Sequence, residues 1–84
     1  MSREAKRQLN ERKFPNWKVF PDNGRKYWID IACRHGWLAR YIKEVDKMEE
    51  TIRFYQEIYD DKGNSIEIHE KFPIDKGHIK VKEK

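Results

Sequence analysis

The chain has 84 residues, of which 37% are hydrophobic and 40% are charged, and a formal net charge of +4. This length allows one small domain and excludes a large multidomain enzyme. No run approaches the ~20 apolar residues of a membrane span, and the mixed-charge N-terminus lacks the apolar segment of a signal peptide. The one cysteine, Cys33, excludes an internal disulfide. We therefore expect a cytoplasmic protein.

The charge is spread unevenly along the sequence. Residues 1–13 carry +3 and residues 14–43 carry +4, whereas residues 44–61 carry −5 and residues 62–84 carry +2. This distribution predicts a polarised surface with room for an anionic partner. The abundance of Lys, Glu and Arg is also typical of proteins from thermophiles.

Residues 2–13 are good helix formers. Met1, Ala5 and Leu9 recur at the spacing of one helix face, which predicts a thin apolar stripe packed against a sheet. The alternative is a basic arm with no fixed structure. Phe14 precedes Pro15 and so should end any helix.

Strand patterns occupy the middle of the chain. Residues 17–20 form a first short strand, and the Pro-Asp-Asn-Gly turn at 21–24 leads into a long strand over 25–34. After His35-Gly36 a third strand covers residues 37–45. Tyr27 and Trp37 are the expected core aromatics, because so polar a domain needs aromatic side chains inside.

Residues 51–72 predict a β-hairpin around an Asp-Asp-Lys-Gly-Asn turn, in which Gly63 supplies a positive φ. Ile79 and Val81 fit a last short strand. The predicted fold is α+β, a single domain with an antiparallel meander of four or five strands over residues 17–81 and an N-terminal helix or basic arm.

Alternation within the hairpin predicts one polar face, with Arg53, Tyr55 and Glu57 on the first strand and His69 and Lys71 on the second. Pairing Tyr55 with Glu67 and Arg53 with His69 gives complementary neighbours. The other register sets like charges opposite one another and is disfavoured. A β-bulge at the turn would shift the pairing of residues between the two strands.

This polar face is the predicted functional site. His69, His78 and Glu57 have the side-chain types of a general acid and base, as metal-independent RNA cleavage requires. The cations that would hold phosphate are Arg40, Arg53 and Lys71, and the aromatics that would stack on bases are Tyr55 and Trp28. The alternative is that these charged side chains have no functional role and are solvated on the sheet surface, with His69 stacked on Tyr55. No zinc-ligand spacing or phosphate-cradling loop occurs, so we expect no metal or cofactor.

The C-terminal part, IRFYQEIYDDKGNSIEIHEKFPIDKGHIKV, resembles small toxin proteins of the TumE type. These similarly have an aromatic strand, a Gly-containing turn, a polar second strand and a Pro-containing segment ending in His. The matching positions are Pro73, Lys76 and His78, whereas Ile74-Asp75 and Gly77-His78 stand where the family has adjacent histidines. The resemblance implies a toxin-antitoxin component that acts on RNA or on the translation machinery, with an antitoxin partner that covers the basic face.

Two functions follow as hypotheses. The first is a domain that engages nucleic acid, RNA before DNA, with ribonuclease activity as its catalytic form. The second is a non-enzymatic interaction module in which the acidic segment 44–61 and the basic N-terminus bind a protein partner or a second copy of the chain.

Overall fold

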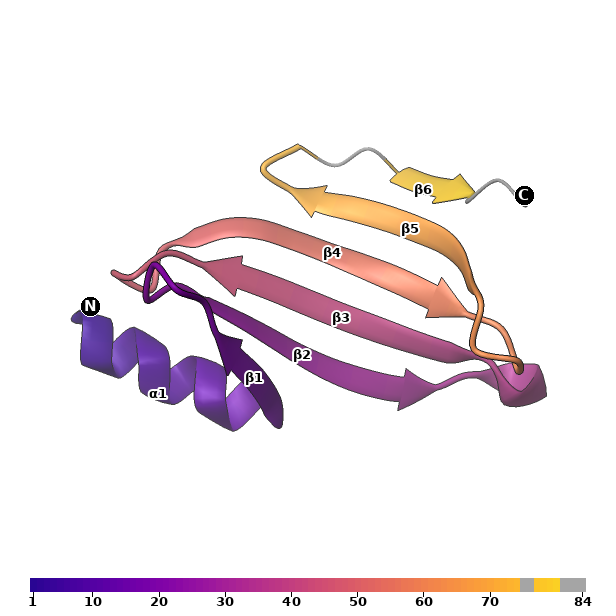
Figure 1. Ribbon diagram of the computed structural model, residues 1–84, viewed down its shortest axis with the longest axis horizontal. Helices are drawn as coiled ribbons and strands as arrows, with labels where there is room; N and C mark the ends of the chain where they lie inside the picture. Colours follow the sequence, from indigo (N-terminus) through magenta and orange to yellow (C-terminus); the bar gives the residue numbers. More distant parts are fainter. Residues whose placement is uncertain (75–76, 81–84) are drawn as a thin grey trace.

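The computed structural model describes residues 1–74 and 77–80. One helix and a six-stranded antiparallel sheet follow each other along the chain, and the strands lie side by side in sequence order (Figure 1). The elements are α1 (Arg3–Lys13), β1 (Asn16–Val19), β2 (Arg25–Ala32), the 3-10 turn η1 (Arg34–Gly36), β3 (Leu38–Val45), β4 (Thr51–Tyr59), β5 (Ser65–Phe72) and β6 (Gly77–Lys80). The predicted α+β meander is confirmed, with β6 as a sixth, short strand.

Local sequence signals fix the two ends of α1. The Ser2 hydroxyl accepts a hydrogen bond from the Ala5 amide at 3.1 Å, which caps the N-terminus. Phe14 is already extended, as the following proline requires. The N-terminal segment is therefore a helix. No helix in the described part of the chain is long and apolar enough to cross a membrane.

The turn between β4 and β5 is built as its composition predicts. The Asp60 carboxylate accepts hydrogen bonds from the amides of Lys62 and Asn64, both at 2.9 Å. Gly63 has a φ of 83°, the left-handed conformation that glycine adopts without steric cost. Short-range chemistry therefore closes this hairpin.

The strand pairing defines two faces of the sheet. Tyr27, Lys43 and Phe54 form one row across β2, β3 and β4 on what we call the helix face. The next row, Trp28, Ile42 and Tyr55, lies on the opposite side, which we call the open face. α1 covers one end of the helix face, where Phe14 packs on Tyr27 with ring centroids 5.9 Å apart.

The core is small and lies between α1 and the sheet. Phe14, Tyr27 and Val45 are fully buried there, with Ile29 and Phe54 packed against them. The expectation that Tyr27 is a core residue is confirmed. Trp37, by contrast, follows the 3-10 turn at the sheet end far from α1 and is 40% exposed, so its assignment to the core was wrong.

The expected apolar stripe on α1 does not pack against the sheet. Leu9 is 46% exposed and Met1 is more exposed still, whereas Asn10 is 5% exposed. The side that meets the sheet carries Arg7, Asn10 and Phe14, which follow helical spacing. The helix is therefore anchored by one aromatic residue and by polar contacts.

The register between β4 and β5 differs from both predicted alternatives. Tyr55 pairs with Glu70, and Gln56 pairs with His69. Irregularities at both ends of this ladder insert one extra residue into β5, between Ser65 and Glu67 and again between Glu70 and Phe72. Because one extra residue reverses which side chains face the core, the prediction of a face shared by Arg53 and His69 was wrong.

Candidate functional site

The structure divides the predicted site between the two faces of the sheet. Arg53 and Tyr55 lie on the open face, together with the paired Glu70. His69 pairs with Gln56, whose amide donates a hydrogen bond to Tyr41 at 3.2 Å, so His69 belongs to the helix face. The predicted constellation is therefore not assembled.

Arg53 is held within the open face by a neighbouring carboxylate. Its guanidinium makes a two-pronged hydrogen bond to Glu70, with N–O distances of 2.5 and 2.8 Å, and its Cζ stands 3.8 Å from the centre of the Tyr55 ring. These contacts with Glu70 raise the pKa of Arg53. The Tyr55 ring is buried beneath this guanidinium and offers no free stacking surface.

Arg40 is paired in the same manner. It makes a two-pronged contact with Asp30 at 2.7 and 3.0 Å and lies over the Tyr59 ring. Glu57 accepts a hydrogen bond from the Tyr59 hydroxyl at 3.0 Å. Carboxylates thus form ion pairs with Arg40 and Arg53 on this face. Trp28, on the same face, is half-buried and lies beside the buried Ile42. The face behaves as a network of internal ion pairs.

The remaining predicted residues lie on or near the helix face. The Lys71 ammonium stands 5.2 Å from the centre of the Tyr41 ring. His78 pairs through its backbone with His69, and its side chain lies outside the described part of the chain, as do Lys76 and the last four residues.

Two of the three proposed catalytic residues, Glu57 and His69, are likewise separated. Glu57 pairs with Ile68 on the open face, whereas His69 lies on the helix face. A general acid and base must reach the same substrate atoms, so Glu57 and His69 cannot act as a pair across the sheet. Within residues 1–74 and 77–80, no three His, Cys, Asp or Glu side chains are grouped so that they could hold a metal ion.

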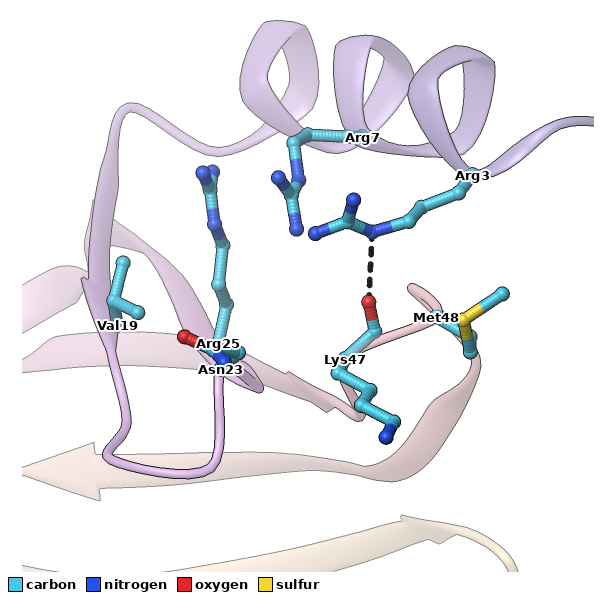
Figure 2. Close-up of a pocket in the computed structure, with 7 residues that line it drawn as sticks. All are labelled: Arg3, Arg7, Val19, Asn23, Arg25, Lys47 and Met48. Atoms are coloured by element: carbon cyan, nitrogen blue, oxygen red, sulfur yellow. Dashed lines mark hydrogen bonds between the residues drawn. The ribbon is translucent and has the colours of Figure 1, made fainter.

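A different concentration of positive charge lies between α1 and the turns of the sheet. We call it the basic pocket, a cavity of about 300 Å³. Figure 2 shows the guanidinium groups of Arg3, Arg7 and Arg25 extending toward the same space. The other lining residues are Val19, Asn23, Lys47 and Met48.

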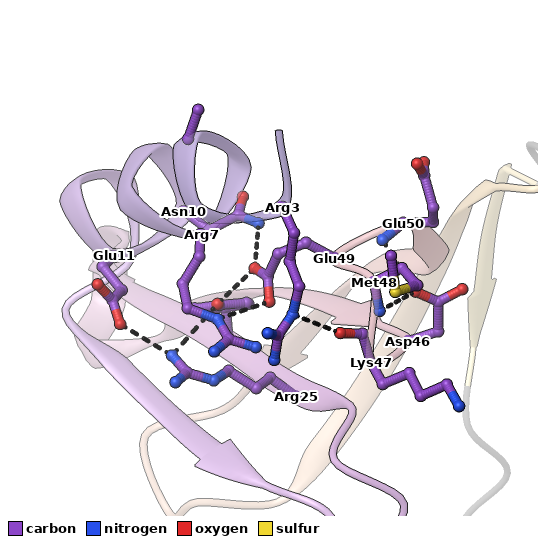
Figure 3. Close-up of polar contacts among 12 residues, drawn as sticks. Arg3, Arg7, Asn10, Glu11, Arg25, Asp46, Lys47, Met48, Glu49 and Glu50 are labelled. Atoms are coloured by element: carbon purple, nitrogen blue, oxygen red, sulfur yellow. Dashed lines mark hydrogen bonds and ion pairs between the residues drawn. The ribbon is translucent and has the colours of Figure 1, made fainter. Parts of the chain in front are cut away.

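The connection between β3 and β4 builds one wall of this pocket. The Asp46 carboxylate accepts hydrogen bonds from the amides of Met48 and Glu50 at 2.9 and 3.0 Å, which folds the connection into a tight loop. The loop presents the Lys47 carbonyl to Arg3 Nε at 2.7 Å (Figures 2 and 3). This bond uses Nε and leaves the two terminal nitrogens of Arg3 beside Arg7.

Glu49 in the same loop anchors the helix. It is 3% exposed and accepts a hydrogen bond from the Tyr27 hydroxyl at 2.6 Å. It also accepts hydrogen bonds from the Asn10 amide at 3.0 Å and from Arg7 Nε at 3.2 Å (Figure 3). Lys43 in turn donates to Asn10 at 2.9 Å. A buried carboxylate with three donors holds α1, the loop and the sheet together.

Protonation of Glu49 should weaken the fold. Burial alone would raise the pKa of this carboxyl group, but the hydrogen bonds from Tyr27, Asn10 and Arg7 outweigh burial and lower the pKa below its ordinary value. Because the unfolded chain then binds the proton more tightly, the stabilisation is complete above the unfolded pKa of about 4.5 and is lost as the pH falls further. We expect urea midpoints to fall more steeply between about pH 5 and pH 3 for the wild type than for Glu49→Gln. Equal slopes for the two proteins would contradict this role.

An aromatic residue flanks the basic pocket. Trp17 on β1 is 41% exposed, and the Arg25 guanidinium lies 5.9 Å from the centre of its ring. Arg25 is also bonded to Glu11 of α1 at 2.9 Å, which fixes its side chain along the edge of the pocket. Arg25 therefore links the pocket, which it lines, to the indole that it lies over.

Sequence reasoning missed the basic pocket because its members are far apart in the chain. Arg3 and Arg7 share a helix side at i, i+4, but Arg25 and Lys47 come from a strand and a loop. The alternation of basic and acidic segments was the available signal. The opposite net charges of residues 1–13 and 44–61 indicate that the two segments attract each other, but they do not show which side chains meet.

The fold and its site define a small α+β protein with a meander sheet and a basic pocket at the helix–sheet junction. Searches of protein-family models, curated proteins and solved structures found no match to this chain.

Proposed function

We propose that this protein binds single-stranded RNA, with phosphate groups in the basic pocket and a base on Trp17. The convergence of three arginine side chains on one cavity is the observation that carries the proposal. Guanidinium groups match the geometry of phosphate oxygens and bind them through paired hydrogen bonds.

The charge balance favours an anionic ligand. Arg3, Arg7, Arg25 and Lys47 line the pocket, and two carboxylates contact them, Glu49 at Arg7 and Glu11 at Arg25. Within the described part of the chain, the three guanidinium groups thus meet two carboxylates, which leaves one positive charge in excess, whereas the Lys47 ammonium points away from them (Figure 2). The open face has no such excess, because its arginines are paired with carboxylates.

Trp17 supplies the second element of single-strand recognition. An exposed indole beside cationic groups can stack on an unpaired base while the cations hold the backbone, and such stacking contributes about 1–3 kcal/mol per base. The resemblance of residues 52–81 to TumE-type toxins supports RNA as the ligand class. Cleavage is not part of the proposal, because Glu57 and His69 lie on opposite faces.

The salt dependence of RNA binding tests the proposal. We expect a fluorescent ten-nucleotide single-stranded RNA to bind with a slope of log K against log salt of about −2, since about three phosphate contacts each contribute roughly −0.7. Fluorescence anisotropy between about 50 and 200 mM salt measures this slope. Duplex DNA should bind more weakly, because its bases cannot reach Trp17. Absence of salt-dependent RNA binding would refute the proposal.

A further inference from the structure

An apolar groove lies on the helix face beside α1. Two adjoining cavities of about 350 and 280 Å³ share Lys13, Phe14 and Phe54 as lining residues. The first extends to Ile31 on β2, and the second extends to Phe72 on β5. The groove therefore crosses four strands of the sheet, from β2 to β5, next to the only α-helix in the described part of the chain.

The floor of the groove is apolar and only partly covered. Ile31 is 49% exposed and Phe72 is 43% exposed, although both lie on the helix face, part of which α1 covers. A sheet face with this composition is stable in water only to the extent that something covers it. α1 is too short to do so.

The rim of the groove is positively charged. Lys13 lies over the Phe14 ring at 5.8 Å, and Lys71 lies over the Phe54 ring at 5.8 Å. Lys43 lines the second cavity, where burial and the proximity of Lys13 lower its pKa. The residues that line the two cavities, within the described part of the chain, include no carboxylate.

From this charge pattern we infer that the groove binds an acidic amphipathic helix of a protein partner, laid across strands β2 to β5 next to α1. Apolar side chains of the partner would cover Ile31, Tyr41 and Phe72, and its flanking carboxylates would pair with Lys13, Lys43 and Lys71. Four strands span about 14 Å, which three turns of helix can cover. A helix added here would complete the second layer that α1 begins. Acidic side chains would also offset the repulsion between Lys13 and Lys43.

Synthetic helical peptides test this inference on the intact protein. The first probe has leucines at i, i+3, i+4 and i+7 and glutamates on its polar side. The second has the same leucines with lysines in place of glutamates. The third keeps the glutamates and has serines in place of leucines. We expect the acidic amphipathic peptide to bind at least about tenfold more tightly than either of the others, measured by fluorescence anisotropy.

A pair of matched variants locates the binding site. Ile31→Glu places a charge on the groove floor and should abolish binding of the acidic peptide. Ile52→Glu is the control, because Ile52 is likewise an isoleucine of a strand, 51% exposed on β4, and lines neither the groove nor the basic pocket. Circular dichroism melts should show that both variants fold. Equal binding of acidic and basic peptides, or equal loss in both variants, would overturn the inference. A concentration-dependent dimer in sedimentation equilibrium that Ile31→Glu dissolves would also overturn it, because a second copy would then fill the groove.

Discussion

Replacement of Arg3 by glutamate should lower the affinity for single-stranded RNA about tenfold, or roughly 1.4 kcal/mol, at low salt. Arg3 is exposed, and its terminal nitrogens face the basic pocket, so the change places a negative charge where a phosphate is expected. The slope of log K against log salt should also become less steep, by roughly 0.7 for each phosphate that the variant no longer binds. Fluorescence anisotropy with the same RNA measures both quantities.

Arg12→Glu is the matched control for this experiment. Arg12 is an exposed arginine of the same helix and does not line the pocket, so the change in net charge is the same. Its effect on RNA affinity should stay within about threefold, because an exposed charge outside the site acts only through a screened field. Equal losses for Arg3→Glu and Arg12→Glu would mean that net charge, and not the pocket, attracts RNA.

Glu49→Ala should destabilise the fold by about 3–5 kcal/mol, because removal of one partner from a buried charged network leaves the others without compensation. The substitution deprives Arg7, Asn10 and Tyr27 of their common acceptor. Glu49 has a positive φ of 66°, and alanine at this position has the same backbone strain as glutamate because both have a Cβ atom. The difference therefore reports the side-chain contacts. Urea denaturation followed by circular dichroism gives the free energy of unfolding.

The adjacent glutamate offers a control for Glu49→Ala. Glu50 is mostly exposed and forms an ion pair with Lys6, a surface contact of about 0–1 kcal/mol. Glu50→Ala should therefore lower the free energy of unfolding by no more than about 1 kcal/mol. If the two variants unfold at similar urea concentrations, the buried network is not what holds α1 on the sheet.

Most of the fold could be predicted from local sequence. The proline after Phe14 ends the helix, the Pro-Asp-Asn-Gly segment and Gly63 mark turns, and the alternating residues between them form strands close to their expected limits. These signals act over a few residues, so they do not depend on what the rest of the chain does. The antiparallel meander then follows, because short turns can join only neighbouring strands.

The faces of the last hairpin could not be predicted in the same way. Strand alternation assigns residues to a face only while the ladder is regular, and β5 has one extra residue near each end. The extra residue next to the turn, Ile66, moves His69 to the opposite face from Arg53. Nothing in the local composition distinguishes this arrangement from a regular hairpin, since both satisfy the same turn.

The docking of α1 depends on a partner distant in sequence. A helix is expected to bury its apolar side, which would favour Ala5 and Leu9. Instead the buried carboxylate of Glu49 makes the polar side with Arg7 and Asn10 the one that meets the sheet. Phe14, placed just beyond the helix, supplies the apolar contact that Leu9 does not.

The three tryptophans give the most direct test of where RNA binds. Trp17 borders the basic pocket, Trp28 lies on the open face, and Trp37 follows the 3-10 turn at the other end of β3. Their indole N–H signals can be followed separately in ¹H–¹⁵N spectra during titration with single-stranded RNA. We predict a saturable shift of the Trp17 signal with little change at Trp28 and Trp37. A shift confined to Trp28 would place the interface on the open face and contradict the account.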